Sequence, residues 1–354
     1  RVRLVLETFH KYGAPDDIMI DAKPHIGTDL LREVIINMRE EIEELGGEFY
    51  FSHKMEDLKI KDGKVEEVVI NSNRYKSGAY VLALGHSARD SFEMLSDKIS
   101  MENKNFAVGF RIEHKRETIN NAQYNGKNTD IEGSILPAAS YNLSYNDKKN
   151  GLSAYTFCMC PGGYVVNASS EEEMTCVNGM SYHARNGENS NSAIIATVGE
   201  EIYGRELLDG MRFQREVEKK AYQLGKGSVP VQRFIDYKNN RTSESYGSIK
   251  PSLESSYELA NLRGLYPKEI ESTLIKAIDY MGNKINGFDD EDAILSAAET
   301  RSSSPIRMLR DKENKAVHID NLYVVGEGSG YSGGIVSSAV DGIKTAEKIL
   351  ERKK

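Results

Sequence analysis

The stretch NLYVVGEGSGYSGGIVSSAVDG, from Asn321 to Gly342, decides the fold that we predict for the C-terminal part of this chain. It opens with the short apolar run of a strand, which ends at Val325. A glycine-rich loop follows from Gly326 to Gly334, and Ile335 to Leu350 has the apolar spacing of a helix. The pattern therefore predicts a strand, a loop and a helix of an α/β fold.

Within this loop Gly328, Gly330 and Gly333 have the G-x-G-x-x-G spacing that lets a backbone approach a dinucleotide closely. The start of the next helix would offer unpaired N–H groups and a positive dipole end to an anion. A first βαβ unit also needs an acidic residue about 20 positions later, and the sequence reaches Lys354 without a second strand. Two interpretations stay open: an ordinary strand-to-helix turn, or the last strand, loop and helix of a flavoprotein, in which Glu327 accepts a hydrogen bond from the ribityl chain.

The sequence pattern of the N-terminal part predicts one long helix followed by strands. No regular element is expected before Gly27, and an amphipathic helix is expected from Thr28, its N-cap, to the stop at Gly46. Asp62-Gly63 is a strong hairpin signal. The last apolar run, which ends at Gly85, predicts a strand buried on both faces. The expected strands are Glu48 to Ser52, Met55 to Ile60, Lys64 to Ile70 and Tyr80 to Leu84.

The middle of the chain differs in composition from both ends. From Lys104 to Ile249, short apolar runs alternate with Asn, Ser, Gly and Tyr, which predicts a mainly β region. Because α/β segments bracket this region, we predict a substrate domain inserted into a nucleotide-binding domain. Helices are expected at Gly210 to Leu224, Pro267 to Met281 and Glu291 to Glu299.

Composition and charge argue against several classes of protein. With 39% hydrophobic and 28% charged residues, the chain has an ordinary globular composition. No apolar run approaches the roughly 18 residues that span a bilayer, and the N-terminal residues lack a signal-peptide pattern. A net charge of −8 without a long basic run argues against nucleic acid. Three cysteines are too few for a disulfide framework, which favours a cytoplasmic protein.

Seven stretches across nearly the whole chain resemble the bacterial FAD-dependent dehydrogenases of unassigned substrate, relatives of the two-dinucleotide-domain flavoproteins. They are GAPDDIMIDAKPHIGTD (Gly13 to Asp29), VLALGHSARD (Val81 to Asp90), FAVGFRIEH (Phe106 to His114), FCMCPGGYVV (Phe157 to Val166), VNGMSYHARNGENSNSA (Val177 to Ala193), AETRSSSPIRMLR (Ala298 to Arg310) and VVGEGSGYSGGIVSSAVDGI (Val324 to Ile343).

The resemblance implies an α/β fold: a flavoprotein FAD-binding α/β domain with an inserted, mainly β substrate domain. The first βαβ unit is expected to be missing, because no G-x-G-x-x-G precedes Gly27. The implied boundaries are 1–103 for the first part of the FAD-binding domain, 104–300 for the substrate domain and 301–354 for the C-terminal return. FAD is the implied cofactor, with Gly85, His86, Gly326, Glu327, Gly328, Gly330, Gly333 and Gly334 on its flavin side.

The implied function is that of an FAD-dependent oxidoreductase, a dehydrogenase or reductase that transfers a hydride between flavin and a small substrate. NAD(P)H or another electron donor or acceptor stays open, and neither nucleic acid nor a membrane is expected as a partner. Two alternatives remain: a non-catalytic flavin- or nucleotide-binding protein, and a fragment that holds no cofactor.

Four residues are candidate catalytic groups. Arg301 and Arg307 lie around a hydroxyl-rich turn and suit an anionic substrate. An interdomain ion pair between Glu299 and an arginine explains them equally well. His114 or His183 would handle a proton near neutral pH. The alternatives are a surface residue after a strand for His114 and a turn-rich loop for His183.

Cys158 and Cys160 form a C-x-C pair next to a Pro-Gly-Gly turn. A cysteine near a flavin could be a redox partner or an acid, but this spacing lacks the C-x-x-C redox pattern. Buried, inert thiols are favoured. A zinc site that adds Cys176 and His183 matches no standard ligand spacing, so no metal is predicted.

Overall fold

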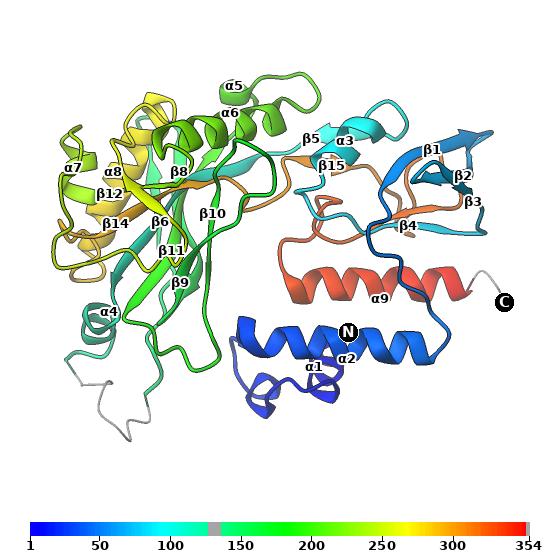
Figure 1. Ribbon diagram of the computed structural model, residues 1–354, viewed down its shortest axis with the longest axis horizontal. Helices are drawn as coiled ribbons and strands as arrows, with labels where there is room; N and C mark the ends of the chain where they lie inside the picture. The colour runs from blue at the N-terminus through cyan, green and yellow to red at the C-terminus, as the bar shows by residue number, and fades with distance from the viewer. Residues whose placement is uncertain (127–135, 352–354) are drawn as a thin grey trace. The chain divides into compact units, whose positions relative to one another are not determined.

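The computed structural model describes residues 1–126 and 136–351. These residues form two compact units of a mixed α/β fold, one of which holds a large sheet. Unit 1 comprises 1–105, 203–211 and 303–354, and unit 2 comprises 106–202 and 212–302. Within the described ranges, no helix has the length and apolar character needed to cross a membrane. Figure 1 shows the elements of both units.

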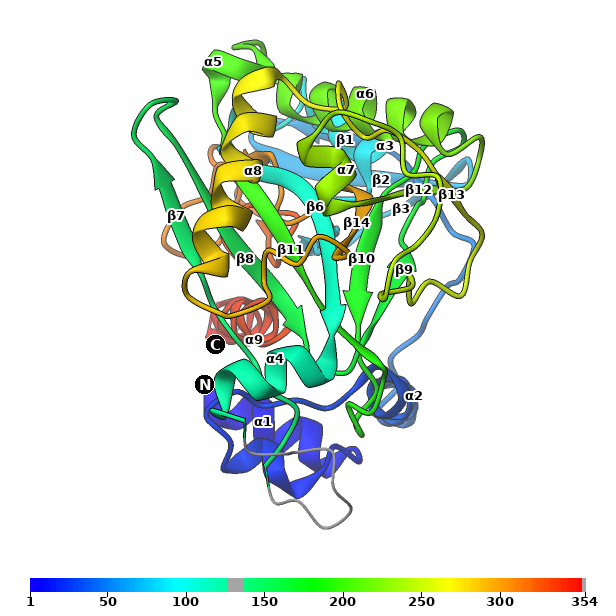
Figure 2. The ribbon, with the colours of Figure 1, turned by 90° about the vertical axis from the view of Figure 1, so that its left-hand side faces the viewer.

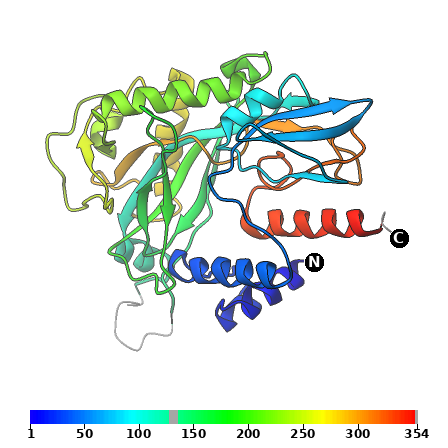
Figure 3. The ribbon, with the colours of Figure 1, turned by 45° about the vertical axis from the view of Figure 1, so that its right-hand side comes forward.

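Most helices of unit 1 pack around one apolar cluster, whereas α3 packs in a second cluster with the strands. Val5 and Phe9, one turn apart, are buried together with Ile18 and Val34, and Val340 packs against them. Figures 1 and 3 both draw α9 between the strands of this unit and its helices α1 and α2. The bounds are α1 Val2–Lys11, the 3-10 helix η1 Asp16–Met19, α2 Thr28–Glu44, α3 Arg89–Leu95 and α9 Ile335–Glu351.

Two expectations for the helices of this region are corrected. The segment before Gly27 contains α1 and η1, and the i, i+4 spacing of Val5 and Phe9 puts both side chains on one face of α1. The long helix is confirmed, but Thr28 is its first residue and Gly27, with φ of 92°, is its N-cap. A glycine suits that position because a φ in this range strains other residues.

The strands among the described residues of unit 1 form three small sheets. β1 and β2 pair antiparallel around Asp62 and Gly63, whose φ angles of 50° and 71° confirm the expected hairpin. β3 extends this sheet, β5 pairs antiparallel with β15, and β4 pairs parallel with β16. The bounds are β1 Met55–Lys61, β2 Lys64–Ile70, β3 Asn73–Tyr75, β4 Tyr80–Leu82, β5 Met101–Asn103, β15 Ile306–Met308 and β16 Leu322–Val324.

Two strand predictions in this unit are wrong in part or in full. No strand forms at 48–52, where Phe49, Tyr50 and Phe51 are exposed and have no partner strand to shield them. β4 forms as expected, but it is not buried on both faces, since Val81 is 48% exposed while Leu82 is buried. The apolar run thus predicted the presence of the strand correctly, but it predicted the burial of its two faces incorrectly.

Unit 2 is built on a seven-stranded sheet in the order β13-β12-β14-β6-β11-β8-β7. Its neighbouring strands pair antiparallel, except β12 with β13. β6 and β11 lie at its centre and are buried along nearly their whole length. The strand bounds are β6 Phe106–Lys115, β7 Ser144–Asp147, β8 Leu152–Cys160, β11 Asn189–Val198, β12 Val229–Arg233, β13 Tyr257–Leu259 and β14 Ile294–Glu299, with β9 Tyr164–Asn167 and β10 Val177–Met180 as a separate pair.

Helices cover this sheet, and Figure 2 shows α8 lying along β7, β8 and β11. The helices expected near 210–224 and 267–281 are confirmed as α6 and α8. The helix expected at 291–299 is wrong. Residues 294–299 form β14, fully buried beside β6, so strand pairing overrides the helical propensity of its alanines. The bounds are α4 Arg116–Gln123, α5 Glu200–Tyr203, α6 Asp209–Leu224, α7 Phe234–Lys238 and α8 Lys268–Gly282.

Candidate functional site

The parallel pair of β4 and β16 brings two loops together in unit 1. Tyr80 pairs with Leu322 and Leu82 with Val324, so both strands end at the same edge. Open α/β sheets bind ligands at the carboxyl ends of their parallel strands. The segments that follow are Leu84 to His86 after β4 and Gly326 to Gly328 after β16.

The two loops touch so closely that one position requires glycine. A Cβ on Gly328 would lie 1.8 Å from the carbonyl oxygen of Leu84, far inside any van der Waals contact. Gly326 and Gly330 have φ angles of 77° and 84°, which other residues seldom adopt. The glycines of this loop are therefore needed for its path as well as for any ligand.

His86 and Glu327 connect the loops through hydrogen bonds. The backbone N–H of His86 donates to Oε2 of Glu327 over 3.2 Å, and the imidazole Nδ1 contacts Oε1. Burial raises the pKa of Glu327, but the interactions with His86 and the charge of Lys104 outweigh it and lower the pKa below its ordinary value. The Nε2 atom of His86 is buried and has no hydrogen-bond partner among the residues described. Glu327 is therefore an ionised acceptor beside an imidazole with one unused nitrogen.

The end of the loop leaves its backbone open at the start of α9. A Cβ on Gly333 would meet nothing within 4 Å, and the N–H of Gly334 donates to Oγ of Ser337 over 3.1 Å. Tyr331 and Ile335, either side of these glycines, are 43% and 60% exposed. Open backbone, a helix start and exposed apolar side chains together suit a flat, partly polar ligand.

Arg310 and Asp341 hold the loop onto α9, and sequence reasoning missed both. Arg310 binds the Asp341 carboxylate through Nη1 and Nη2 at 2.7 and 2.9 Å, and the N–H of Gly326 donates to the same carboxylate over 2.9 Å. Asn314 donates to Asp341 and to Thr345, one helical turn further along. The available signal was the i, i+4 spacing of Asp341 and Thr345, which puts both polar side chains on one face of α9.

Arg307, a predicted catalytic residue, lies beside this loop. Its Nη1 binds Glu102 at 2.8 Å, and its guanidinium carbon is 5.2 Å from the centre of the Tyr331 ring. Burial and the charge of Arg307 lower the pKa of the nearby Lys104. Two cations thus flank the loop, and Lys104 was not among the predicted site residues.

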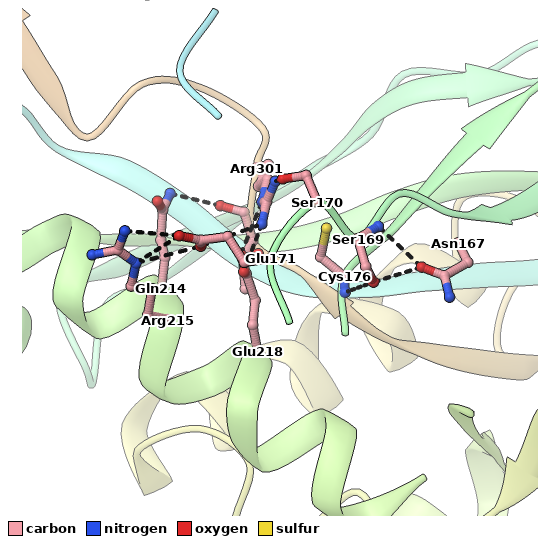
Figure 4. Close-up of polar contacts among 10 residues, drawn as sticks. Asn167, Ser169, Ser170, Glu171, Cys176, Gln214, Arg215, Glu218 and Arg301 are labelled. Carbon is pink, nitrogen blue, oxygen red and sulfur yellow. Dashed lines mark hydrogen bonds and ion pairs between the residues drawn. The ribbon is translucent and has the colours of Figure 1, made fainter. Parts of the chain in front are cut away.

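Arg301, by contrast, belongs to a closed network in unit 2, drawn in Figure 4. Its Nε and Nη2 donate to the Glu218 carboxylate over 3.1 and 2.8 Å, and its Nη1 donates to Ser170 over 2.5 Å. The side chains of Arg301 and Glu218 are 8% and 0% exposed. Thr300 also donates to Glu218, over 2.6 Å. The guanidinium is therefore occupied by protein groups.

The expected ion pair between Glu299 and an arginine forms with Arg111, and neither of the two candidate arginines takes part in it. Arg301 pairs with Glu218 and Arg307 pairs with Glu102. Glu299 instead lies 3.6 Å from Arg111, within unit 2, so this pair is not interdomain. Sequence spacing could not identify these partners, because each pairing depends on which strands become neighbours.

The two candidate histidines differ in their surroundings. His114 is fully buried in unit 2, which contradicts its interpretation as a surface residue. Its Nε2 lies 2.7 Å from the carbonyl oxygen of Phe288, and burial lowers its pKa to about 4. His183 lies half-buried in the loop between β10 and β11, near Cys176 in sequence. Its catalytic role stays a prediction, as does that of His114.

The cysteines only partly match the expectation of buried thiols. Cys160 and Cys176 are buried, Cys158 is exposed, and none of the three forms a disulfide with another described residue. In the parts of the chain that the structure describes, no three His, Cys, Asp or Glu side chains come together as a metal site would require. The zinc set of Cys158, Cys160, Cys176 and His183, which the ligand spacing already disfavoured, is not among the groupings of the described residues.

Comparison with known proteins relates the chain to flavoproteins. The family model described as FAD-dependent protein, C-terminal domain-like, matches residues 105–302. An uncharacterized protein of Clostridium beijerinckii is 45% identical over 99% of this chain, and the chain spans 66% of that relative's length.

Similarity to solved structures is weaker. An oxidoreductase from Methanosarcina mazei is 10% identical, with a TM-score of 0.34, over 90% of this chain and 54% of the other. Pyridoxine 4-oxidase from Mesorbium loti is 12% identical, with a TM-score of 0.30, over 100% of this chain and 70% of the other. TM-scores this low do not establish a shared fold.

Proposed function

The chain belongs to the FAD-dependent protein, C-terminal domain-like family, with FAD as its cofactor, and we propose that it acts as an FAD-dependent oxidoreductase. When bound, FAD supplies hydride transfer to or from a small substrate. In this proposal residues 1–103 and 301–354 form the FAD-binding part and residues 104–300 the substrate domain. The substrate, the electron donor or acceptor, and the finer assignment as a dehydrogenase belong to the same proposal.

The observation that carries the proposal is the contact of His86 with Glu327 at the carboxyl ends of β4 and β16. This is where an α/β sheet binds a nucleotide cofactor. The residues fit FAD in two further respects. The buried Nε2 of His86 has no hydrogen-bond partner among the described residues, so a ligand could bind it. No protein atom lies within 4 Å of a Cβ on Gly333, so a ligand can approach the backbone there.

Each group would have a distinct role toward the flavin part of FAD. Glu327, kept ionised by its neighbours, would accept a hydrogen bond from a hydroxyl of the cofactor. The glycine backbone from Gly330 to Gly334 would pack against it, and the exposed side chains of Tyr331 and Ile335 would exclude water. Lys104 and Arg307 would favour an anionic group nearby.

Arg301 and His114 are less suited to contact a substrate than the sequence suggested. The guanidinium of Arg301 is engaged by Glu218 and Ser170, and His114 is fully buried with a depressed pKa. We therefore assign to Arg307, rather than to Arg301, the orientation of an anionic substrate. His183 remains the better candidate for proton transfer, because it is only half-buried.

The test substitutes an open glycine of the loop and a matched glycine elsewhere. Gly333 and Gly78 both lie in unit 1, both have an ordinary φ, and a Cβ on either meets nothing within 4 Å. Gly333→Leu should fold normally but weaken FAD binding at least about tenfold, a loss of about 1.4 kcal/mol. Gly78→Leu should bind like the wild type. Binding is measured from the quenching of flavin fluorescence on titration with the purified protein.

Equal FAD affinity for both variants would contradict the assignment of this loop. Activity is tested separately, by anaerobic reduction of the bound flavin with small-molecule donors, including NADH and NADPH. Flavin that dithionite reduces, but that no organic donor reduces and no acceptor reoxidises, would favour a non-catalytic flavin-binding protein. Rapid reduction by one donor class would identify the substrate or the electron donor.

A further inference from the structure

A second polar site lies in unit 2, at the end of β8, and has no part in the proposed function. β8 and β11 change register there: Asn191 pairs with Cys160 while Ala193 pairs with Phe157, so β8 carries one extra residue. Such a bulge turns a side chain away from its regular direction. Cys158 lies within the bulge, has a φ of 44° and is exposed, whereas Cys160 is buried.

Arg111, in the middle of β6, forms hydrogen bonds with both cysteines. Its guanidinium is fully buried, and its Nη2 donates to the carbonyl oxygen of Cys158 over 2.6 Å and to Sγ of Cys160 over 3.2 Å. Its Nε donates to Oδ1 of Asn191 over 2.8 Å. A Cβ on Gly179 would lie 1.9 Å from Nη2, so only glycine lets β10 cover this guanidinium.

Several buried polar atoms at this site have no hydrogen-bond partner in the described ranges. They are Nη1 of Arg111, Nδ2 of Asn191 and Oε2 of Glu299, all on side chains at most 3% exposed. Nη1 and Oε2 face each other at 3.6 Å, beyond hydrogen-bond distance. Buried polar groups are normally paired, so each unpaired one needs an explanation, of which a redox or catalytic role is one. The buried guanidinium of Arg111 therefore has hydrogen-bond partners for Nε and Nη2 but none for Nη1 in the described ranges.

The surroundings give the two thiols opposite acidities. Hydrogen bonding with the Cys160 thiol and the charge of Arg111 outweigh burial and lower the pKa of Cys158 to about 5. The same contact, together with burial, raises the pKa of Cys160. The charged or titratable groups around Cys158 are Arg111 on β6, Cys160 on β8 and Glu299 on β14. These directions favour the thiolate form at Cys158 and the thiol form at Cys160.

We propose that Cys158 and Cys160 form a redox-active dithiol whose substrate is a small-molecule disulfide, with Cys158 as the attacking group and Cys160 as the resolving group. In the first step the Cys158 thiolate attacks one sulfur of the disulfide RSSR. A bond forms between Sγ of Cys158 and that sulfur, the S–S bond of RSSR breaks, and RS⁻ leaves. In the second step Sγ of Cys160 attacks Sγ of Cys158, a bond forms between them, and the second RS⁻ leaves. The thiol proton of Cys160 passes to a leaving thiolate. The dithiol loses two electrons and the small disulfide gains them.

The geometry sets the order of these steps. Cys158 attacks first because it is the exposed and ionised thiol. Once Cys158 is in a mixed disulfide, its negative charge is gone, and Arg111 donates to Cys160 with no competing thiolate. Since the acidities of the two thiols depend on each other, the first step makes Cys160 easier to deprotonate. The bulge disrupts the regular pairing of β8 with β11 at these residues and bends the strand, so residues 158 and 160 need not keep the spacing of a regular strand.

The experiment treats the purified, reduced chain with bis(2-hydroxyethyl) disulfide and maps the products by non-reducing peptide mass spectrometry. The wild type should yield a disulfide between Cys158 and Cys160 with release of two equivalents of thiol. Cys160→Ser should stop at the mixed disulfide on Cys158, and Cys158→Ser should lose the reaction. Cys176→Ser is the matched control, a buried cysteine outside this site, and should react like the wild type.

A second measurement needs no variant. The rate at which iodoacetamide alkylates Cys158 in the wild type should rise with a midpoint near pH 5, against about 8.5 for an ordinary cysteine. A midpoint near the ordinary value would overturn the activated thiol. A mixed disulfide on Cys158 that persists in the wild type would overturn the resolving role of Cys160. Either result leaves FAD binding by unit 1 unaffected, so the two proposals fail independently.

Discussion

Replacing Asp341 with alanine should destabilise unit 1 and move the glycine loop. The Asp341 carboxylate accepts two hydrogen bonds from Arg310 and one from the backbone of Gly326, the residue that begins the loop. The side chains of Arg310 and Asp341 are only 10% and 9% exposed, so solvent does little to screen the pair. Loss of the carboxylate leaves a nearly buried guanidinium without its counter-ion.

The expected loss is about 4 kcal/mol, the sum of two contributions. Breaking a buried ion pair from one side costs about 3–5 kcal/mol. Arg310 keeps its hydrogen bond to the carbonyl oxygen of Val324, at 2.8 Å, which favours the low end of that range. The unpaired N–H of Gly326 adds about 1 kcal/mol. In the double variant Arg310→Met/Asp341→Ala the stranded charge is gone, and the two effects should fall short of additivity by about 1–3 kcal/mol.

Hydrogen exchange of α9 peptides measures this in the full chain, because exchange resolves the unit that opens. Glu347→Ala is the control: this residue lies on the same helix and pairs with Arg1 in the open, where solvent screening leaves little to lose. Asp341→Ala should also weaken FAD binding, since Gly326 loses its anchor. A stability change no larger than that of Glu347→Ala, or strict additivity in the double variant, would refute the reasoning.

The same carboxylate gives a pH dependence with a definite sign. Burial acts to raise the pKa of Asp341, but the hydrogen bonds from Arg310 and Gly326 outweigh it and lower the pKa in the folded state. A depressed folded pKa means that the stabilisation is complete above the unfolded value of about 3.9 and is lost as the pH falls below it. The difference between wild type and Asp341→Ala should therefore shrink only in acid below about pH 4.

Three further predictions concern single residues. The folded pKa of His114, about 4, lies below its ordinary value of 6.5, so unit 2 should lose up to about 3 kcal/mol as the pH falls between those values. In His114→Gln the stability of unit 2, measured by hydrogen exchange as the pH is lowered, should depend less on pH between those values. Burial raises the pKa of Glu299 to about 7, so it is already neutral when Cys158 titrates near pH 5. Glu299→Gln should leave the midpoint of Cys158 alkylation in place, and a clear upward shift would count against the arrangement. Gly328→Ala should cost about 1–3 kcal/mol, because its Cβ would collide with a backbone carbonyl, whereas Gly342→Ala, in open space on α9, should be neutral or stabilising in the same unfolding assay.

Local pattern was sufficient where an element's shape depends on its own residues. Asp62-Gly63 predicted the hairpin of β1 and β2, because the turn needs two positive φ angles in succession. The apolar spacing of α8 and α9 and the glycine loop before α9 were likewise visible in the sequence. The loop residues proposed for cofactor contact came from this local signal and from family resemblance. That His86 meets Glu327 followed only once β4 and β16 paired.

Two segments have a secondary structure that depends on pairing with distant strands, and the local sequence pattern predicted both incorrectly. The six residues of β14 favour a helix by composition, but the place between β6 and β12 makes them a strand. Phe49 to Phe51 have strand-forming side chains and no neighbour to pair with. Secondary structure in both cases depends on backbone partners that lie far away in the chain.

The sequence by itself determined the long amphipathic helices α2, α6, α8 and α9, the turn at Asp62-Gly63 and the glycine loop, because periodicity and turn chemistry act over a few residues. Only the tertiary structure decided which charges are paired, which thiol is exposed and which histidine is buried. Arg301 forms hydrogen bonds with Glu218, 83 positions away in the sequence, and Arg111 forms one with Cys160, 49 positions away. The energy of such groups depends on desolvation and on the partners that neighbouring strands provide, and neither can be read from residues that are adjacent in the chain.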